Sequence, residues 1–378
     1  MPALRVALLT NFIPPYRVPL YQEIQRRCSA LRILLSATSE SNRDWTPDWE
    51  SLPVQLQRNL QIRGHWRHPH RFSEPLTLHV PYDTIPQLMR FCPDVVISAE
   101  LGMRTAQAAA YCQLSNAPLV MWATLSDVTE QGRGRLRRWL RPKLLRHADS
   151  LIINGAGGVR YLRGLGVNPS KMFRAPYTTD LGPFLALPTE RSVGLRHRLL
   201  YSGSLTHRKG LMLFLPTLSN WVARNVDRNV ELVVVGQGPL SPEVSGFHCP
   251  KNLTIRVLGP VPYDQVPDVY RNGGILIFPT LADEWGMVVT EAMAAGVPVL
   301  GSLYSQAVEE LVIDGENGWT FRPDRPAEMY GALDRALNAS HDSVSQMAVR
   351  ARSAAREITP SSVAEAVFAA MDFARRAA

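Results

Sequence analysis

Two acids, Asp283 and Glu291, flank a predicted turn in a way that could place carboxylates beside a bound ligand. Asp283 precedes a Trp-Gly pair, and Glu291 lies on residues 287–295, whose Glu, Ala and Met content favours a helix. The apolar run GGILIFPT, residues 273–280, predicts a buried strand just upstream. The first amides of such a helix attract anions, phosphates above all. Taken singly, Asp283 could instead be a surface helix cap and Glu291 a solvated helix residue.

Two cations, Arg208 and Lys209, lie in SGSLTHRKG, residues 202–210, between a predicted strand and a Leu-rich helix. When a bond between a sugar and a diphosphate breaks, negative charge develops on the leaving diphosphate. A fixed pair of cations lowers that barrier electrostatically. The ordinary alternative is a solvated Arg-Lys pair at a surface turn, because these side chains are rarely buried.

Length and element order predict two α/β domains. A chain of 378 residues exceeds one ordinary core. Buried-strand runs alternate with helical segments, which favours parallel sheets with helices on both faces. A Pro-rich stretch over residues 177–197 predicts a linker. Residues 38–81 predict weaker elements and irregular structure near a site or an edge. No glycine occurs between Met1 and Gly64, so a G-x-G-x-x-G loop is missing after the first strand, which argues against NAD binding.

The pattern of an acid, seven residues and a second acid, followed by AMAAGVPV, resembles the signature of the retaining GT-B glycosyltransferases of family 4. This resemblance implies that Glu291 contacts the ribose and Asp283 the donor hexose, although the family has Glu where this chain has Asp283. SGSLTHRKG resembles the family's G-R-L-x-x-x-K-G loop, so Lys209 matches the lysine that holds the donor diphosphate. Ser204 stands where that loop has its Arg, and Arg208 is expected to be the substitute cation.

Other segments of residues 200–325 continue the resemblance and imply a donor site. VVVGQGP is similar to a family strand and turn, which implies close approach of the donor at Gly236; a tight turn after a central strand is the alternative. LGPVPYDQVPDVYRNG is similar to the segment that reads the donor base, which makes Val261 a candidate. The other predicted donor-binding residues surround the helix start: Trp285, Gly286, Met287 and Val288.

By the same resemblance we expect a GT-B fold, with two Rossmann-like domains whose parallel sheets face one another across a cleft. The acceptor domain would be residues 1–180, with a final helix at residues 360–378 packing back on it, and the donor domain residues 196–358. The first domain departs from the family, because its first loop lacks paired glycines and VMWATLSD lacks a His. Acceptor roles are assigned by position, with packing as the alternative for the aromatic residues: Asn11, Tyr16, Arg17, Trp122 and Thr124.

The expected reaction is retaining transfer of a hexose from a UDP- or GDP-linked sugar. The sequence places no carboxylate as a nucleophile, so we expect a front-face mechanism in which the donor's phosphate helps to deprotonate the acceptor. No Asp-x-Asp occurs, which argues against the metal-dependent GT-A class, and we expect neither metal nor cofactor. An epimerase or phosphorylase on the same fold is one alternative. A nucleic-acid-binding protein is another, and charge alone supports it.

Basic residues are concentrated in residues 132–147, within a chain of formal charge +8 and pI near 9.5. Trp and Leu lie between these cations, a pattern typical of a segment on an anionic membrane surface. An ordinary amphipathic helix with a core-facing Leu side is the alternative, and Pro142 is expected to interrupt it. The cations are Arg133, Arg135, Arg137, Arg138, Arg141, Lys143 and Arg146.

Location is predicted from patterns that are missing from the sequence. No apolar run approaches the ~20 residues that span a bilayer, and the first strand is too short for a signal peptide. Four scattered cysteines form no disulfide framework. We expect a cytoplasmic protein, peripheral on the inner face of the cell membrane. Its acceptor would be a lipid-linked saccharide in the synthesis of cell-envelope polysaccharide or glycolipid.

Overall fold

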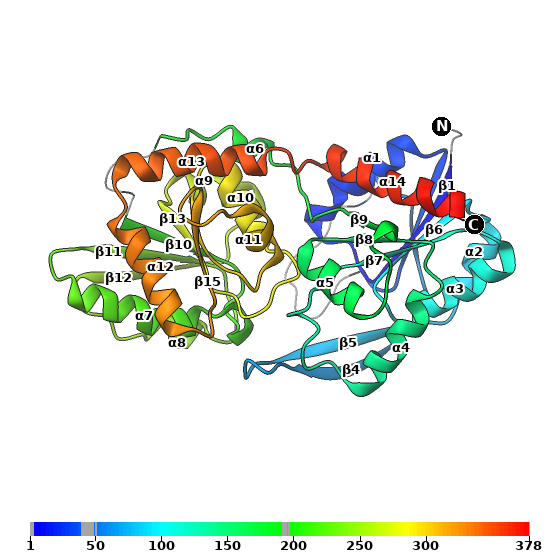
Figure 1. Cartoon of the computed structure of the whole chain (residues 1–378), viewed down its shortest axis with the longest axis horizontal. Helices are drawn as coiled ribbons and strands as arrows, with labels where there is room; N and C mark the ends of the chain where they lie inside the picture. Colours follow the sequence, from blue (N-terminus) through cyan, green and yellow to red (C-terminus); the bar gives the residue numbers. More distant parts are fainter. Residues whose placement is uncertain (1–3, 39–48, 50, 191–194, 196, 378) are drawn as a thin grey trace. The chain divides into compact units, whose positions relative to one another are not determined.

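The computed structural model of the chain describes residues 4–38, 49, 51–190, 195 and 197–377. The chain divides into two compact units, each with its own parallel sheet (Figure 1). The first unit comprises Met1–Pro69, Ser73–Asp180 and Ile358–Ala378, and the second comprises His70–Phe72 and Leu181–Glu357.

The first unit is built on a seven-stranded parallel sheet in the order β3-β2-β1-β6-β7-β8-β9. Its central strands are the apolar runs that the sequence predicts, and β6, β7 and β8 are buried along their whole length. The strands are β1 (Arg5–Thr10), β2 (Ala30–Leu35), β3 (Val54–Leu56), β6 (Val95–Ala99), β7 (Leu119–Ala123), β8 (Ser150–Ile153) and β9 (Met172–Arg174). The helices that precede the second unit are α1 (Val18–Arg27), α2 (Thr84–Phe91), α3 (Met103–Ser115), α4 (Arg135–Leu145) and α5 (Ala156–Gly164), with the short helices η1 (Pro15–Arg17) and η2 (Pro169–Lys171).

Two expectations for the first unit are wrong. The irregular structure expected over residues 38–81 is wrong for residues 51–81, which contain β3 and the antiparallel hairpin of β4 (Asn59–Arg67) and β5 (Ser73–Pro81); residues 39–48 and 50 lie outside the described residues. Pro142 does not interrupt its helix, since α4 continues through it to Leu145. No helix among the described residues combines the length and the apolar character needed to cross a membrane.

The final helix α14 (Pro360–Ala377) belongs to the first unit, although 177 residues of the second unit precede it in the chain, Leu181–Glu357. It packs on α1, β8 and β9. The Ser150 hydroxyl donates to the carbonyl of Ala370 at 2.8 Å, and the rings of Phe173 and Phe373 lie 5.5 Å apart. These contacts tie the C-terminal helix to the sheet of the first unit.

The second unit has a six-stranded parallel sheet in the order β12-β11-β10-β13-β14-β15. Its strands are β10 (Arg198–Ser202), β11 (Val230–Val235), β12 (Leu253–Gly259), β13 (Ile275–Phe278), β14 (Val299–Ser302) and β15 (Gly318–Phe321). Its helices are α6 (Gly182–Leu185), α7 (Leu211–Arg224), α8 (Ser241–Ser245), α9 (Val266–Arg271), α10 (Met287–Ala294), α11 (Gln306–Leu311), α12 (Pro326–Asn338) and α13 (His341–Ala355), with the short helices η4 (His207–Lys209) and η5 (Tyr263–Gln265).

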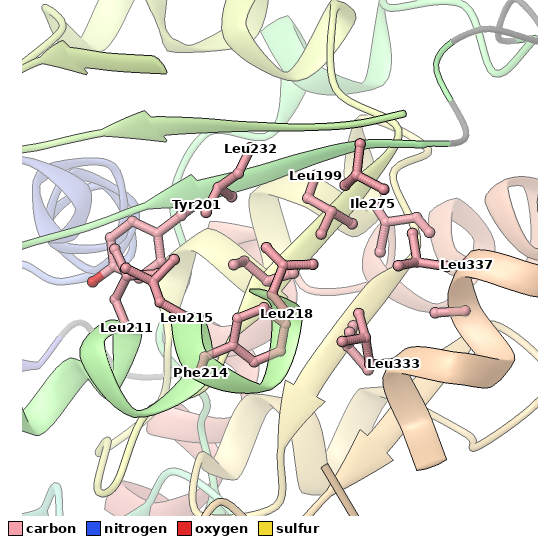
Figure 2. Close-up of a cluster of buried hydrophobic side chains, with 14 of the residues drawn as sticks. Leu199, Tyr201, Leu211, Phe214, Leu215, Leu218, Leu232, Ile275, Leu333 and Leu337 are labelled. Carbon is pink, nitrogen blue, oxygen red and sulfur yellow. The ribbon is translucent and has the colours of Figure 1, made fainter. Parts of the chain in front are cut away.

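The core of the second unit follows from the helical spacing of apolar residues in α7. Figure 2 shows Leu211, Phe214, Leu215 and Leu218 on one side of this helix, where they pack with Leu199 and Tyr201 of β10. Residues three and four positions apart share a helix face, so this spacing directs one apolar stripe at the sheet. Each fully buried side chain of this size contributes roughly 1.5 to 3 kcal/mol. The core therefore holds the start of α7, and with it the preceding loop, against β10.

In both units the order of the strands reverses beside the first strand of the sheet. The reversal lies between β1 and β6 in the first unit and between β10 and β13 in the second. Loops that leave the carboxyl ends of two such strands diverge to opposite faces of the sheet, and ligands of open α/β sheets bind where they diverge. We therefore expect functional side chains in the loops that follow β1, β6, β10 and β13.

Candidate active site

An ion pair joins the loops after β10 and β13. Lys209 Nζ lies 2.5 Å from Asp283 Oδ2, and Arg208 Nη1 lies 3.8 Å from the same oxygen. Burial alone would raise the pKa of Asp283, but Lys209 and Arg208 outweigh it and lower this pKa below its ordinary value. Asp283 is therefore a buried carboxylate ion between two cations, and it is not the surface helix cap that was the alternative.

The backbone around this ion pair is fixed by its own hydrogen bonds. The carbonyl of Arg208 accepts from the amide of Leu281 at 2.7 Å and from the hydroxyl of Thr280 at 3.2 Å. Gly210 has φ of 72°, and a Cβ there would lie 2.0 Å from the carbonyl oxygen of Pro279. Glycine is therefore required for the two loops to approach this closely, and the approach brings Lys209 to Asp283.

Helix α10 begins at Met287, four positions after Asp283. Its first residue follows Gly286, which has φ of 104° and would carry a Cβ only 2.8 Å from the ring of Phe278. Met287 and Val288 in the first turn are half-buried. The start of α10, with the partial positive charge of its amides, thus lies next in sequence to the ion pair.

Glu291 is 5% exposed and points its carboxylate at two tyrosines, so it is not a solvated helix residue. Its oxygens accept hydrogen bonds from the hydroxyls of Tyr263 and Tyr270, both at 3.2 Å. Burial raises the pKa of Glu291 to about 7, although the two hydroxyls act in the opposite direction. Tyr263 is half-exposed and Tyr270 is buried. Neither tyrosine was predicted as a site residue, because nothing in the sequence of their segment indicates contact with Glu291.

The other predicted donor residues occupy varied positions in the second unit. Gly236 has φ of 125°, and a Cβ there would lie 2.0 Å from the carbonyl oxygen of Gly203, so packing is enough to explain this glycine. Trp285 is buried, and its indole donates to the hydroxyl of Thr290 at 3.1 Å. Ser204 is exposed and Val261, after β12, is half-buried. Contacts of all these residues with a donor stay predictions.

Four of the predicted acceptor residues contact other side chains at the carboxyl edge of the first sheet. Asn11 follows β1 and hydrogen-bonds to Glu100 and to Arg104. Arg17 lies over the ring of Trp122, 4.8 Å from its centroid, and over that of Tyr177 at 4.3 Å. Tyr16 contacts the ring of Tyr177 at 5.6 Å, and Thr124 is half-buried after β7.

Glu100, Arg104 and Tyr177 were missed in this group. Glu100 has the unusual φ of 69° for a residue other than glycine, which no sequence pattern indicates. The acceptor roles of the whole group stay predictions.

No group of three or more His, Cys, Asp or Glu residues in the part of the chain that the structure describes is arranged to hold a metal ion.

Two family models match the chain. The model described as "Glycosyl transferase 4-like domain" matches residues 14–178 in the first unit, and "Glycosyl transferases group 1" matches residues 196–339 in the second. The two matches are consecutive, and the second contains the Lys209–Asp283 ion pair and Glu291.

Curated relatives match over part of their length. An uncharacterized glycosyltransferase of Methanocaldococcus jannaschii is 26% identical over 153 residues, which are 39% of this chain and 38% of that protein. A D-inositol 3-phosphate glycosyltransferase of Corynebacterium diphtheriae is 26% identical over 279 residues, 67% of this chain and 64% of that protein. The matched region therefore spans less than two thirds of either relative.

Solved structures match the fold over nearly the whole chain. HepE of Anabaena, in complex with UDP, has a TM-score of 0.73 at 15% identity and covers 98% of this chain and 100% of that one. With the two family matches and the two Rossmann-like units, this likeness shows that the chain belongs to the GT-B glycosyltransferases of the group 1, family 4 type.

Proposed function

We propose that the chain transfers a hexose from a nucleotide diphosphate sugar to an acceptor. The observation that carries this proposal is the group of two cations around one carboxylate, Lys209 and Arg208 around Asp283. The group keeps a net positive charge, and the start of α10 adds partial positive charge from its amides. A diphosphate is the donor group that matches this arrangement. HepE of Anabaena was solved with UDP bound, which supports a donor of this class.

We infer that transfer proceeds with retention and without a protein nucleophile. Asp283 is already engaged by Lys209, and Glu291 by two tyrosines, so neither carboxylate is available to attack the anomeric carbon. The base that deprotonates the acceptor hydroxyl would then be an oxygen of the donor's own phosphate. Lys209 and Arg208 would stabilise the leaving diphosphate while Asp283 orients the hexose and Glu291 holds the ribose. No metal is part of this proposal.

For the acceptor we propose a lipid-linked saccharide, reached by attachment of α4 to an anionic membrane. Leu136 is 72% exposed and Trp139 59% exposed, which are large exposures for apolar side chains. Lys143 Nζ lies over the ring of Trp139 at 3.3 Å. Cations around exposed Trp and Leu suit a membrane surface. The exposed cations of this helix and its end are Arg135, Arg138, Lys143 and Arg146.

Arg141 is not part of that surface, which corrects the sequence-based assignment. Its side chain is buried and forms an ion pair with the equally buried Glu130, and it also donates to the hydroxyl of Tyr161 at 3.2 Å. Arg137 is 35% exposed and contacts the same carboxylate at 3.5 Å. Replacing Arg141 would leave the buried carboxylate of Glu130 with only the more distant Arg137, so Arg141 does not belong in a test of membrane binding.

Lys209→Ala should lower kcat/KM for transfer by on the order of 2 to 4 kcal/mol in transition-state energy, roughly 30- to 1000-fold. The lysine stabilises charge that develops on the leaving diphosphate, and Arg208 remains to pair with Asp283. The donor is found first by thermal stabilisation with a panel of UDP and GDP sugars. Lys251→Ala, an exposed lysine in the same unit, is the matched control. Near-normal turnover in Lys209→Ala would refute the site.

Glu291→Gln should change stability in a pH-dependent way. The folded-state pKa is about 7 and the ordinary value 4.5, so between these pH values the folded chain binds the extra proton. Wild-type unfolding free energy should therefore fall as pH rises through this window, by on the order of 3 kcal/mol in total. Glutamine lacks this loss, so the variant gains relative stability toward pH 8 while it loses donor affinity.

Denaturant unfolding from pH 5 to pH 8.5 measures this gain. Glu243→Gln, exposed on α8, is the matched control. A constant difference between Glu291→Gln and wild type across the series would contradict the buried carboxylate.

Replacing Arg135, Arg138, Lys143 and Arg146 by Gln should release the protein from anionic vesicles. Each cation contributes about 1 kcal/mol near such a surface, so binding should weaken on the order of a thousandfold at low salt. Donor hydrolysis should be unaffected. Co-sedimentation with vesicles that contain phosphatidylglycerol measures the binding. The charge-matched control replaces four exposed arginines elsewhere in the first unit: Arg26, Arg90, Arg163 and Arg174. Equal release of both variants, or no binding by the parent, would refute attachment through α4.

A further inference from the structure

Two buried arginines lie at the carboxyl edge of the first sheet, where the strand order reverses. Arg104 is 3% exposed and lies in the first turn of α3, and Arg17 is 7% exposed and ends η1. Arg17 donates to the hydroxyl of Tyr21 at 3.5 Å, and the same hydroxyl interacts electrostatically with Arg104. The two guanidinium groups therefore belong to one cluster.

Arg104 is only partly satisfied. One nitrogen, Nη2, donates to Asn11 and lies 4.0 Å from the carboxylate of Glu100. The other two, Nε and Nη1, are buried without a hydrogen-bond partner among the described residues. The side chain of Glu100 is 43% exposed, so solvent weakens its compensation of the buried charge. A single nitrogen of Arg104 is enough to hold Asn11. Burying the other two costs free energy of desolvation, and no hydrogen bond within the protein compensates that cost.

Arg17 has no carboxylate partner in the described part of the chain. It hydrogen-bonds to the hydroxyls of Tyr21 and Tyr177, interacts electrostatically with Tyr16, and lies over the rings of Trp122 and Tyr177. Trp122 is fully buried, and its indole Nε1 also lacks a hydrogen-bond partner among the described residues. The cluster thus contains two buried cations, one half-exposed acid and three donor nitrogens without an acceptor. Such excess charge and unused donors are costly unless an anion compensates them.

We propose that this cluster binds an oxyanion, a phosphate or carboxylate carried by the acceptor, and that Arg17 and Arg104 select acceptors with such a group. The oxygens would accept from the unused nitrogens of Arg104, and Arg17 would balance the charge. The start of α3 follows Gly102 without a capping side chain and adds a favourable field for an anion. Position supports the same conclusion, because ligands of open α/β sheets bind where the strand order reverses. The acceptor part of this inference rests on the proposed transferase function, but oxyanion binding does not.

The first experiment measures thermal unfolding of the full chain against inorganic phosphate, with saturating UDP present to occupy the donor site. The parent should gain stability as phosphate rises. Arg17→Gln, Arg104→Gln and Trp122→Phe should each need at least tenfold more phosphate for the same gain. Trp122→Phe keeps the ring shape and removes one unused donor, so it tests the cluster even if Arg104→Gln does not fold. Arg90→Gln, exposed on α2, is the control for surface binding and should behave as the parent.

An unchanged phosphate response in Arg17→Gln and Trp122→Phe would overturn the proposal, as would a parent that phosphate does not stabilise. Repeating the titration in Lys209→Ala without UDP separates this site from the donor site. If the phosphate response depends on Arg17 in that background while no nucleotide sugar stabilises the chain, the oxyanion site stands and the transferase proposal fails. If nucleotide sugars stabilise the chain and phosphate does not, the transferase proposal stands and the oxyanion site fails.

Further titrations identify the source of the oxyanion. Acetate in place of phosphate tests a carboxylate, and a soluble hexose phosphate tests a phosphorylated sugar. Vesicles with phosphatidylglycerol test a lipid phosphate, compared between the parent and Arg17→Gln. A preference of at least tenfold that is lost in Arg17→Gln assigns the group to that source. Equal weak responses to all probes in the parent and in Arg17→Gln would contradict a built site.

Discussion

The ion pair between Lys209 and Asp283 is the interaction on which the candidate donor site depends. The two residues are 74 positions apart in the chain, and they meet because they follow β10 and β13, the strands between which the sheet order reverses. Their approach requires Gly210, where any side chain would meet the backbone of Pro279. One carboxylate then compensates two cations incompletely. The remaining positive charge, rather than any single residue, is what suits the site to a diphosphate.

The same topology has a different electrostatic outcome in the first unit. There the reversal lies between β1 and β6, and the side chains that meet are those of Asn11, Glu100 and Arg104. The acid is half-exposed and the arginine is buried, so the charge is less well compensated than in the second unit. Each unit thus presents excess positive charge at the carboxyl edge of its own sheet. Two anionic groups, one on the donor and one on the acceptor, would match these two edges.

Much of the fold could be predicted from the sequence, because buried parallel strands consist of short runs of apolar residues. RVALLT gives β1, and the runs around Val95 and Leu119 give β6 and β7. The β4–β5 hairpin was not predicted, because its strands mix Arg, His and Trp with apolar residues and no glycine turn lies between them. The hairpin is also held by a contact that no local pattern shows, the bond from the indole of Trp66 to the carbonyl of Gln131, 65 positions away.

The residues of the site could be predicted from the sequence only where they belong to local motifs. Asp283, Glu291 and Lys209 stand in recognisable motifs, and the structure brings Lys209 and Asp283 together. Two other features depend on partners distant in sequence. The sequence pattern predicts Arg141 as one more surface cation, but in the structure it is buried in an ion pair with Glu130. Arg104 is a single arginine in an Ala-rich helix, and only the fold shows that its nitrogens are buried and unused. Burial of charge, unlike burial of apolar side chains, leaves little trace in a single sequence.

The most direct test of the central claim is calorimetric titration of UDP, or of GDP if that nucleotide stabilises the chain, into wild type and Asp283→Asn. In the proposed site, Asp283 competes with the diphosphate for Lys209 and Arg208. Removing its charge should therefore tighten binding of the diphosphate on the order of tenfold at low salt, while binding of the bare nucleoside stays constant and transfer falls. Equal or weaker nucleotide binding by Asp283→Asn would contradict the claim that these two cations hold the diphosphate.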